Sequence, residues 1–311
     1  MQEAGRMGWR TELWTSSDTR LMTESQRGAF DSVEQVDRYD FDAFAARELS
    51  ADVVFVDEMY LPDTFYEAGR DFTDALPGAK LVAMDDMRQR SMGAVDLVIN
   101  TELGLRSAAY EASESLLGER YCLIREGFEN PIKKDWPENR GLIPVLVMVG
   151  GTDPFGCSSD VLEALRTMGD SSIAPVLICG DGKQAEALRF ELSQFPEYRL
   201  EVGLDDLGMA GWIATCSMGV IGCSSSMYEF AALGTPFVGL SVADNQEISA
   251  RKIESEWKLP VIRRSGEGLS QEALVSALRQ VAASLDEGKS FAFGNVDLLG
   301  ARRAMNAIAA L

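Results

Sequence analysis

Short apolar runs that alternate with helical stretches are the feature that most constrains how this chain can fold. The runs Val53–Val56 and Ile143–Val149 are apolar without interruption instead of alternating with polar residues. A strand of this kind is buried on both faces, as in a parallel sheet that helices cover on each side. The sequence therefore predicts an α/β protein with doubly wound parallel sheets.

The same strand-then-helix pattern recurs in both halves of the chain. The predicted strands are Arg10–Thr15, Asp52–Asp57, Lys80–Met84, Val95–Asn100, Pro144–Val149, Pro175–Cys179, Arg199–Val202, Met218–Ile221 and Phe237–Leu240. The predicted helices are Phe41–Leu49, Pro62–Leu76, Ser158–Met168, Lys183–Gln194, Leu207–Thr215, Ser226–Leu233, Gln246–Trp257, Gln271–Leu285 and Leu298–Leu311.

The chain has 311 residues, enough for two domains. Around Glu126–Leu142, Asn-Pro, Lys-Lys and Trp-Pro pairs interrupt the pattern, which is typical of a linker. We predict a Rossmann-like domain at 1–128, a linker at 129–142, a second Rossmann-like domain at 143–296, and a C-terminal helix at 297–311 that packs back on the first domain. The first half opens without the usual strand and ligand loop, so we expect its opening strand to be missing.

The formal net charge is −20, which disfavours nucleic-acid binding because a phosphate backbone would be repelled. An anionic small molecule would need local donors such as backbone N–H groups, helix N-termini or a few arginines. No apolar run is long enough to cross a bilayer, and no signal-peptide pattern is present, so we expect a cytoplasmic protein without membrane insertion. Five scattered cysteines without a CxxC pair indicate reduced thiols.

The sequence contains no histidine. This excludes Ser-His-Asp triads, Cys-His dyads and histidine-based zinc sites built from this chain. The run Gly222–Ser226 also lacks the second glycine of a nucleophile elbow. We expect neither a metal nor a cofactor.

Two strand ends in the second half carry residues suited to a phosphorylated ligand. Gly150-Gly151-Thr152-Asp153 follows a buried strand, and glycine there lets a ligand approach the backbone closely. Gly222-Cys223-Ser224-Ser225-Ser226 leads into a helix whose N-terminal amides and dipole favour a diphosphate. Glu229 lies about one turn further on, where a carboxylate can accept hydrogen bonds from ribose hydroxyls. The alternatives are a plain turn and a serine-capped helix.

Other strand ends carry polar residues with a structural and a functional reading. Asn245, followed by Gln246, stands where a helix cap is expected, and the spacing favours the cap over an amide aimed at a ligand. Asp57, Asp85 and Asp86 follow apolar strands of the first half. Carboxylates at strand ends are candidate acid or base groups, although they more often cap turns or helices.

An ordered set of motifs resembles the hydrolase family of the pseudaminic acid pathway, whose members act on UDP-2,4-diacetamido-2,4,6-trideoxy-β-L-altropyranose. The set extends from about residue 8 to the C-terminus. The matching segments are 55–60 (FVDEMY), 84–86 (MDD), 95–100 (VDLVIN), 116–118 (LLG), 121–128 (YCLIREGF), 150–153 (GGTD), 222–229 (GCSSSMYE), 245–246 (NQ) and 300–303 (GARR).

The resemblance implies two Rossmann-like domains in a GT-B-like arrangement, with a UDP-sugar between them. It places UDP against the loops that contain Gly150, Gly151 and Thr152, and Gly222, Cys223, Ser224 and Ser225. It assigns Glu229 to the ribose, and Asn245 with Gln246 to the reacting centre. It also matches Tyr60 to a tyrosine after the first-domain Asp57, although one extra residue separates the two here.

The mechanism implied by the resemblance is attack of water on the anomeric carbon, inversion and departure of UDP, without a metal and from a monomer. The family's general base is a histidine in an N-terminal Gly-x-Gly-His loop, and this sequence has neither. We therefore expect that the opening strand and its base-bearing loop are absent. Two alternatives are a UDP-sugar-dependent glycosyltransferase and a nucleotide-sugar binder with impaired catalysis.

Overall fold

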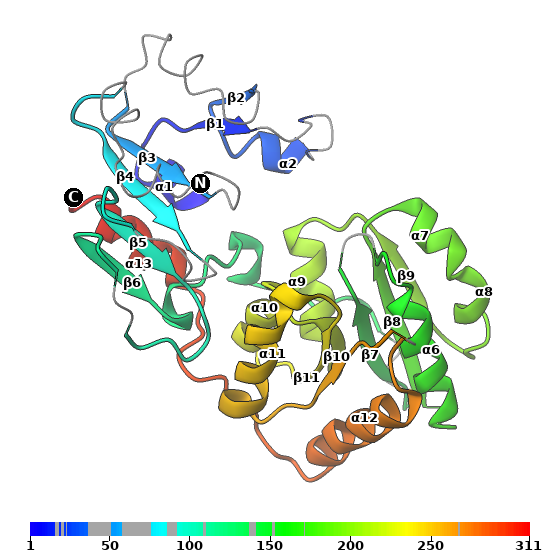
Figure 1. Ribbon diagram of the computed structural model, residues 1–311. Coiled ribbons are helices and arrows are strands. Elements are labelled where there is room, and N and C mark those ends of the chain that lie inside the picture. Colours follow the sequence, from blue (N-terminus) through cyan, green and yellow to red (C-terminus); the bar gives the residue numbers. More distant parts are fainter. Residues whose placement is uncertain are drawn as a thin grey trace. The chain divides into compact units, whose positions relative to one another are not determined.

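The computed structural model describes residues 1–15, 19, 22, 24–36, 51–57, 76–85, 92–107, 110–136, 141–150, 153–170, 172–266 and 268–311. The chain divides into two compact units, drawn with colours that follow the sequence in Figure 1. Unit 1 consists of Met1–Leu123 and Leu299–Leu311, and unit 2 consists of Ile124–Leu298. Residues 124–136, which the sequence places at the end of the first domain and in the linker, belong to unit 2.

Unit 1 contains parallel strands in two sheets. Its described elements are α1 (Gln2–Arg6), β1 (Glu12–Thr15), α2 (Glu24–Arg27), β2 (Ser32–Gln35), β3 (Val53–Val56), β4 (Lys80–Met84), β5 (Leu97–Asn100), β6 (Glu114–Leu117), the 3-10 turn η2 (Glu119–Tyr121) and α13 (Gly300–Ile308). Strands β1 and β2 pair in parallel, and the second sheet has the order β3-β4-β5-β6. This second sheet follows chain order and does not reverse direction among its described strands.

The central strands of unit 1 are buried on both faces, as their continuous apolar sequences predict. Leu81 and Ala83 of β4 pack with Val98 on one face of the sheet. Val82 points to the other face, where Ile308 of α13 packs against it. The last helix of the chain therefore completes the core of the unit in which the chain begins.

Unit 2 is a six-stranded parallel sheet with the order β12-β11-β10-β7-β8-β9. Its strands are β7 (Ile143–Met148), β8 (Ile173–Cys179), β9 (Arg199–Val202), β10 (Met218–Gly222), β11 (Phe237–Ser241) and β12 (Val261–Arg263). Its helices and turns are η3 (Glu126–Phe128), α6 (Cys157–Thr167), α7 (Gly182–Ala187), α8 (Arg189–Leu192), α9 (Asp206–Thr215), α10 (Ser226–Ala232), η5 (Asp244–Gln246), α11 (Glu247–Lys252), the π-turn η6 (Ile253–Trp257) and α12 (Gln271–Asp286).

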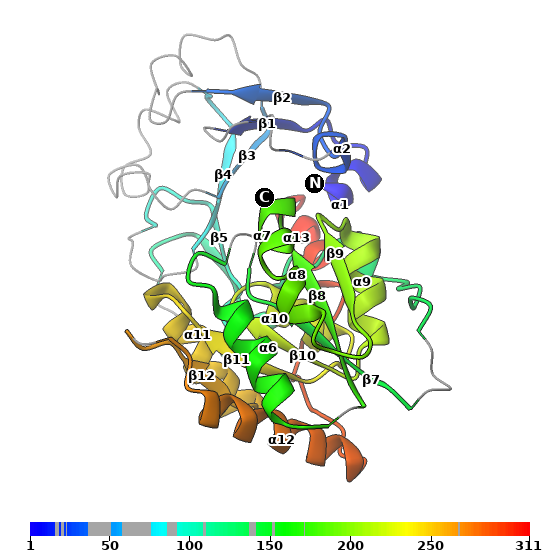
Figure 2. The same cartoon turned by 90° about the vertical axis from the view of Figure 1, so that its right-hand side faces the viewer.

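Helices cover both faces of this sheet. Valines of β7 pack with Val161 of α6 and with Leu274 and Leu278 of α12 in one continuous core. Figure 1 shows α9, α10 and α11 on the opposite side, and Figure 2 shows α6 in front of the sheet with α12 beside it. The result is the three-layer, doubly wound arrangement that the alternating sequence predicts.

Several elements differ from the predictions. The short strands β2, β6 and β12 were not predicted, because their sequences lack a continuous apolar run. The predicted helix Lys183–Gln194 is two short helices that meet at Leu188. The predicted helices Phe41–Leu49 and Pro62–Leu76 lie outside the described residues, except for Leu76. Among the described helices, none is both long enough and apolar enough to span a membrane.

Candidate functional site

The sheet of unit 2 changes winding direction between β7 and β10, and this point defines the candidate site. From β7 the chain adds β8 and β9 on one side, and then returns to add β10, β11 and β12 on the other. The two central strands lie side by side, with Val147 paired to Val220 and Met148 to Ile221. In open parallel sheets the loops that follow such a pair diverge, and ligands bind between them. The two loops singled out from the sequence are the loops at this position.

The loop after β7 begins at a glycine that the backbone requires. Gly150 has a φ of +110°, a conformation that L side chains rarely adopt, and nothing lies within 4 Å of where its Cβ would be. The open space leaves its backbone accessible from solvent. Gly151 and Thr152 lie outside the described residues. Asp153 ends the loop and accepts hydrogen bonds from the N–H groups of Cys157 and Ser158, at 2.9 and 2.7 Å, so its carboxylate caps α6.

The loop after β10 leaves two backbone donors at the start of α10. Ser224 is exposed, and its N–H donates to the carbonyl of Gly222 at 2.8 Å. The N–H groups of Ser225 and Ser226 donate no hydrogen bond within the described part of the chain. The serine side chains also make no capping hydrogen bond to α10, contrary to the serine-cap alternative. An oxyanion at this loop would therefore find unsatisfied donors.

Cys223 faces the protein interior and not the solvent-exposed side of this loop. The residue is buried, and its N–H donates to the carbonyl of Leu240 at 2.9 Å. Burial raises the pKa of its thiol to about 12. A Cβ at Gly239 would lie 3.0 Å from the Cys223 sulfur, so the glycine on β11 makes room for this thiol. Cys223 thus shapes the loop from below.

Glu229 lies in the first turn of α10, where the sequence places it, and has a partner that sequence reasoning missed. Its Oε1 accepts a hydrogen bond from Nε of Arg125 at 3.0 Å and forms an ion pair with Nη2 of the same side chain at 2.8 Å. Burial raises the pKa of Glu229, and Arg125 opposes that shift. Arg125 lies 104 residues earlier, in a stretch without regular pattern, so no local signal could have revealed the pair.

Gln246 reaches the same strand ends from the loop after β11. Its Oε1 accepts a hydrogen bond from the N–H of Val242 at 2.8 Å. Its Nε2 lies 3.8 Å from where a Cβ on Gly222 would be, beside the carbonyl of Val149. Asn245 is exposed and caps neither η5, whose N-cap is Ala243, nor α11. The prediction that Asn245 caps a helix is therefore wrong, because η5 begins one residue before it, at Asp244.

A second cation missed by the sequence analysis lies at the loop after β7. The guanidinium carbon of Arg264, which follows β12, is 4.1 Å from the ring centroid of Phe155. Its Nε is buried and has no hydrogen-bond partner among the described residues. An arginine just past the end of a strand is the sequence signal that could have identified it. It provides positive charge near a loop suited to an anion.

In unit 1 the predicted acidic residues lie at the carboxyl ends of their strands. Asp57 follows β3 and is exposed, whereas Asp85 follows β4 and is buried. The hydroxyl of Tyr110 donates to Asp85 at 2.9 Å and accepts from the amide of Asn100 at 2.8 Å. Tyr60 and Asp86 lie outside the described residues. In the described chain no cluster of three or more Cys, Asp or Glu residues is arranged to hold a metal ion.

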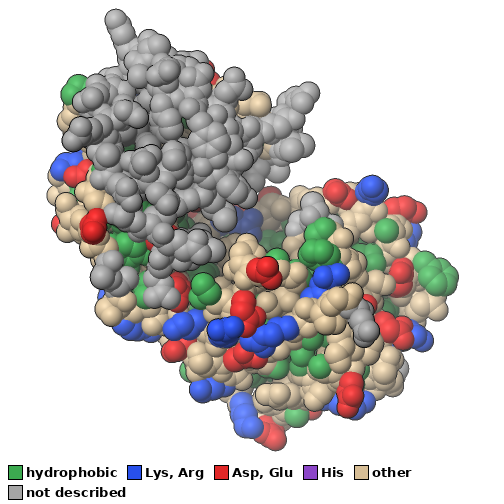
Figure 3. Space-filling model, viewed as in Figure 1, with side chains coloured by type: hydrophobic (Ala, Val, Ile, Leu, Met, Phe, Trp, Pro, Cys, Tyr) green, Lys and Arg blue, Asp and Glu red, His purple; other side chains and the backbone are tan. Residues whose placement is uncertain are grey.

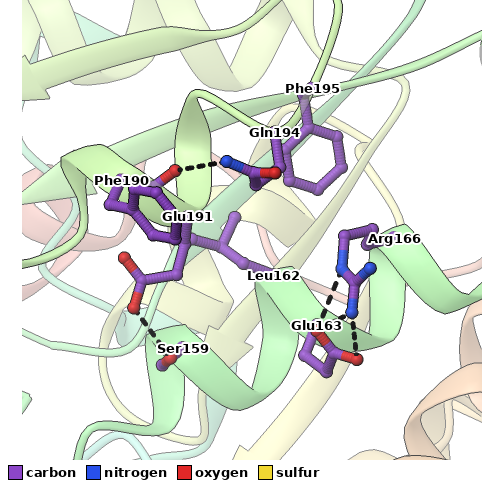
Figure 4. Close-up of a pocket in the computed structure, with 8 residues that line it drawn as sticks. All are labelled: Ser159, Leu162, Glu163, Arg166, Phe190, Glu191, Gln194 and Phe195. Carbon is purple, nitrogen blue, oxygen red and sulfur yellow. Dashed lines mark hydrogen bonds and ion pairs between the residues drawn. The ribbon is translucent and has the colours of Figure 1, made fainter.

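A separate hollow of about 220 Å³ lies between α6 and α8 and shares no residue with the loops that follow β7 and β10. Figure 4 shows the hydroxyl of Ser159 directed at Glu191, and Arg166 paired with Glu163 on the same helix. Across the visible face of unit 2, acidic and basic side chains are interspersed (Figure 3). Neither feature adds a residue to the site between β7 and β10.

Comparison with known proteins extends these observations. No protein-family model matches the chain. The spore coat polysaccharide biosynthesis protein SpsG of Bacillus subtilis (strain 168) is 21% identical over 277 residues, which cover 88% of this chain and 79% of SpsG. The structure of S. aureus MnaA with UDP superposes with a TM-score of 0.63 at 9% identity, covering 96% of each chain. Acinetobacter baumannii MurG gives a TM-score of 0.62 at 13% identity, covering 99% of this chain and 93% of MurG.

The fold is GT-B-like. The structural likeness covers nearly the whole chain, and it agrees with the parallel sheets and the covering helices of the two Rossmann-like units. At these identities the likeness defines the fold, and the function must be argued from the site.

Proposed function

We propose that the protein binds a UDP-linked sugar between the loops that follow β7 and β10 of unit 2, where the strand order reverses. We further propose that it hydrolyses this sugar at the anomeric carbon and releases UDP. The observation that carries the proposal is the reversal of strand order between β7 and β10, with a positive-φ glycine on one side and unsatisfied amides on the other. Such a crevice suits the diphosphate of a nucleotide.

The relatives support the choice of ligand. One structural neighbour, S. aureus MnaA, was determined with UDP. SpsG, the sequence relative, is named for polysaccharide biosynthesis. Together with the motif resemblance to the UDP-sugar hydrolases of the pseudaminic acid pathway, these names favour a UDP-linked amino sugar as the substrate.

Different residues of unit 2 suit different parts of a UDP-sugar. The amides of Ser225 and Ser226 and the cation of Arg264 suit the phosphates, and Glu229 suits the hydroxyls of the ribose. Asn245 and Gln246 present amide groups at the neighbouring loop. These groups would stabilise the negative charge that develops on UDP as the bond from the anomeric carbon to the phosphate oxygen breaks.

Water must lose a proton as its oxygen bonds to the anomeric carbon, and this chain has no histidine to accept that proton. Asp57 and Asp85 are the described carboxylates at strand ends that we assign as candidate bases. Replacing a positioned base with the isosteric amide lowers the rate by about 10²–10⁴-fold. UDP release should therefore fall by about that factor in Asp57→Asn or in Asp85→Asn, and unchanged release in both variants would contradict the assignment.

The test measures UDP binding by calorimetry, and UDP release from the UDP-2,4-diacetamido sugar, in the same samples. Gly150→Ala should raise the Kd for UDP about tenfold, equivalent to roughly 1.4 kcal/mol. Gly141→Ala is the matched control, because Gly141 also has a positive φ and open space around it but lies outside the site. Equal affinity in both variants would contradict the location of the site, and absence of UDP binding by the unmodified protein would contradict the ligand.

The lack of histidine specifically favours one alternative, a nucleotide-sugar binder without turnover. Tight UDP binding combined with no UDP release would support that function over hydrolysis. Release of UDP that depends on an added sugar acceptor would instead identify a glycosyltransferase.

A further inference from the structure

The ion pair between Arg125 and Glu229 joins two segments of unit 2 that are far apart in sequence. Both guanidinium contacts are to the same carboxylate oxygen, Oε1: Nε donates a hydrogen bond to it at 3.0 Å, and Nη2 lies 2.8 Å from it in the ion pair. The Glu229 side chain is 15% exposed and that of Arg125 is 43% exposed. Oε2 of Glu229 accepts no hydrogen bond within the described residues, so one half of the carboxylate is fixed and the other half remains for a ligand.

Arg125 is held in place from its other side. Its guanidinium carbon lies 5.3 Å from the ring centroid of Phe128, which is fully buried. In the sequence between Arg125 and Phe128, the N–H of Gly127 donates to Oδ2 of Asp206, the first residue of α9, at 3.1 Å. A Cβ on Gly127 would lie 2.9 Å from the backbone and carboxylate of Asp206, so the turn η3 fits tightly against α9. The guanidinium of Arg125 therefore contacts both Glu229 and the ring of Phe128, on a turn that packs closely against α9.

This arrangement determines both the charge and the orientation of Glu229. Burial raises the pKa of the carboxyl, nearby Asp206 acts in the same direction, and Arg125 counteracts both. Only the ionised form offers two oxygens that purely accept hydrogen bonds. With Oε1 occupied by Arg125, a fixed acceptor remains at the first turn of α10, beside the loop proposed to bind the phosphates.

We propose that Arg125 is a positioning residue that makes the site selective for ribonucleotides over 2′-deoxyribonucleotides. The inference rests on the proposed function, because it takes the ligand to be a nucleoside diphosphate whose ribose faces Glu229. A vicinal 2′,3′-diol supplies hydroxyl donors to the fixed carboxylate, and a 2′-deoxyribose lacks one of them. Arg125 does not itself contact the ligand in this scheme; it acts through Glu229.

The experiment compares the Kd values of UDP and 2′-deoxy-UDP, measured by calorimetry on the full chain. The unmodified protein should prefer UDP by about tenfold or more, the usual worth of a hydrogen bond to a charged group. Arg125→Gln should reduce this preference to about twofold or less by weakening UDP while leaving 2′-deoxy-UDP nearly unchanged. Arg125→Lys keeps the charge and should restore part of the preference. Arg279→Gln, an exposed arginine of α12, is the matched control and should behave as the unmodified protein.

The outcomes separate the two hypotheses. If Arg125→Gln weakens both nucleotides equally, Arg125 has only a general structural or electrostatic role, and the inference is wrong while the proposed function stands. The same conclusion follows if the unmodified protein binds UDP without preferring it over 2′-deoxy-UDP. If UDP does not bind at all, the proposed function fails and the inference fails with it. Circular dichroism of each variant, with Arg125→Lys as the milder change, guards against loss of fold.

Discussion

The first residue of α13 provides a sharp test of how unit 1 is held together. A Cβ on Gly300 would lie 2.1 Å from the carbonyl oxygen of Cys122 and 2.8 Å from its amide nitrogen, well inside the 3.4 Å at which ordinary contact begins. Both atoms belong to the backbone and cannot turn aside. Gly300→Ala must therefore push α13 away from the turn that contains Tyr121 and Cys122.

The loss of stability caused by Gly300→Ala depends on the contacts that α13 makes with the core of unit 1. Ala304 and Ile308 pack against Val82 in the core of unit 1, and Arg303 donates to the carbonyl of Arg120 at 2.8 Å. Overpacking of this kind costs about 1–3 kcal/mol. The better helix propensity of alanine offsets at most about 1 kcal/mol of this destabilisation. We expect Gly300→Ala to lower the free energy of unfolding of unit 1 by about 2 kcal/mol.

Gly182→Ala is the matched control, because Gly182 is also the first residue of a helix but has nothing within 4 Å of its Cβ position. Urea unfolding followed by hydrogen exchange resolves the two units separately, since exchange reports on each peptide. Gly300→Ala should lower protection in α13 and β5 and leave unit 2 unchanged, whereas Gly182→Ala should be neutral or slightly stabilising. Equal unfolding midpoints for the two variants would refute this account of the packing.

Three further predictions concern other parts of the chain. Asp153→Ala removes the cap of α6 and should destabilise unit 2 by about 1–2 kcal/mol in urea unfolding, with Asp153→Asn less affected; no difference between the two would argue against the cap. Burial alone would raise the pKa of Glu119, but hydrogen bonds from Arg106 and a backbone N–H hold it below its ordinary value of 4.5. This stabilisation is present above the unfolded pKa and is lost as pH falls through the folded one. The destabilisation caused by Glu119→Gln, measured by thermal unfolding, should therefore shrink below about pH 4. Burial raises the pKa of Cys223 to about 12, so at pH 8 Ellman's reagent should label it rapidly only in denaturant, and rapid labelling of the native protein would contradict its placement.

Sequence patterns predicted the elements that depend on local composition. The strands Lys80–Met84 and Arg199–Val202 occur with the predicted bounds, and the helix at Gln271 begins where predicted. Edge strands were missed because three or four residues such as Val261–Arg263 carry too little periodicity to distinguish them from loops. Helix ends were harder to predict, as the predicted helix Gln246–Trp257 shows, because it begins as a 3-10 turn and ends in a π-turn.

The candidate site also contains some features that local sequence predicts and others that depend on the fold. Gly150, Gly222 and Glu229 could be picked out because glycines and a carboxylate after buried strands have a local signature. The adjacency of their loops follows from the strand order, which the sequence predicted only as a class of fold. Arg125 could not be found from spacing, because its partner is 104 residues away, whereas Arg264 carries a local signal in its position just past a strand, although its contact with Phe155 is equally remote in sequence.

The membership of α13 in unit 1 has a consequence for synthesis of the protein on the ribosome. Residues 299–311 are made after unit 2, yet they supply one face of a core whose other residues emerge before residue 124. Unit 2 is contiguous and can complete its sheet during translation, at about 5–20 residues per second. Unit 1 must therefore wait for residues 299–311, and until then Val82, Leu97 and Ile99 are incompletely covered. Synthesis of that segment, rather than translation of the strands of unit 1, sets the earliest time at which unit 1 can complete its core.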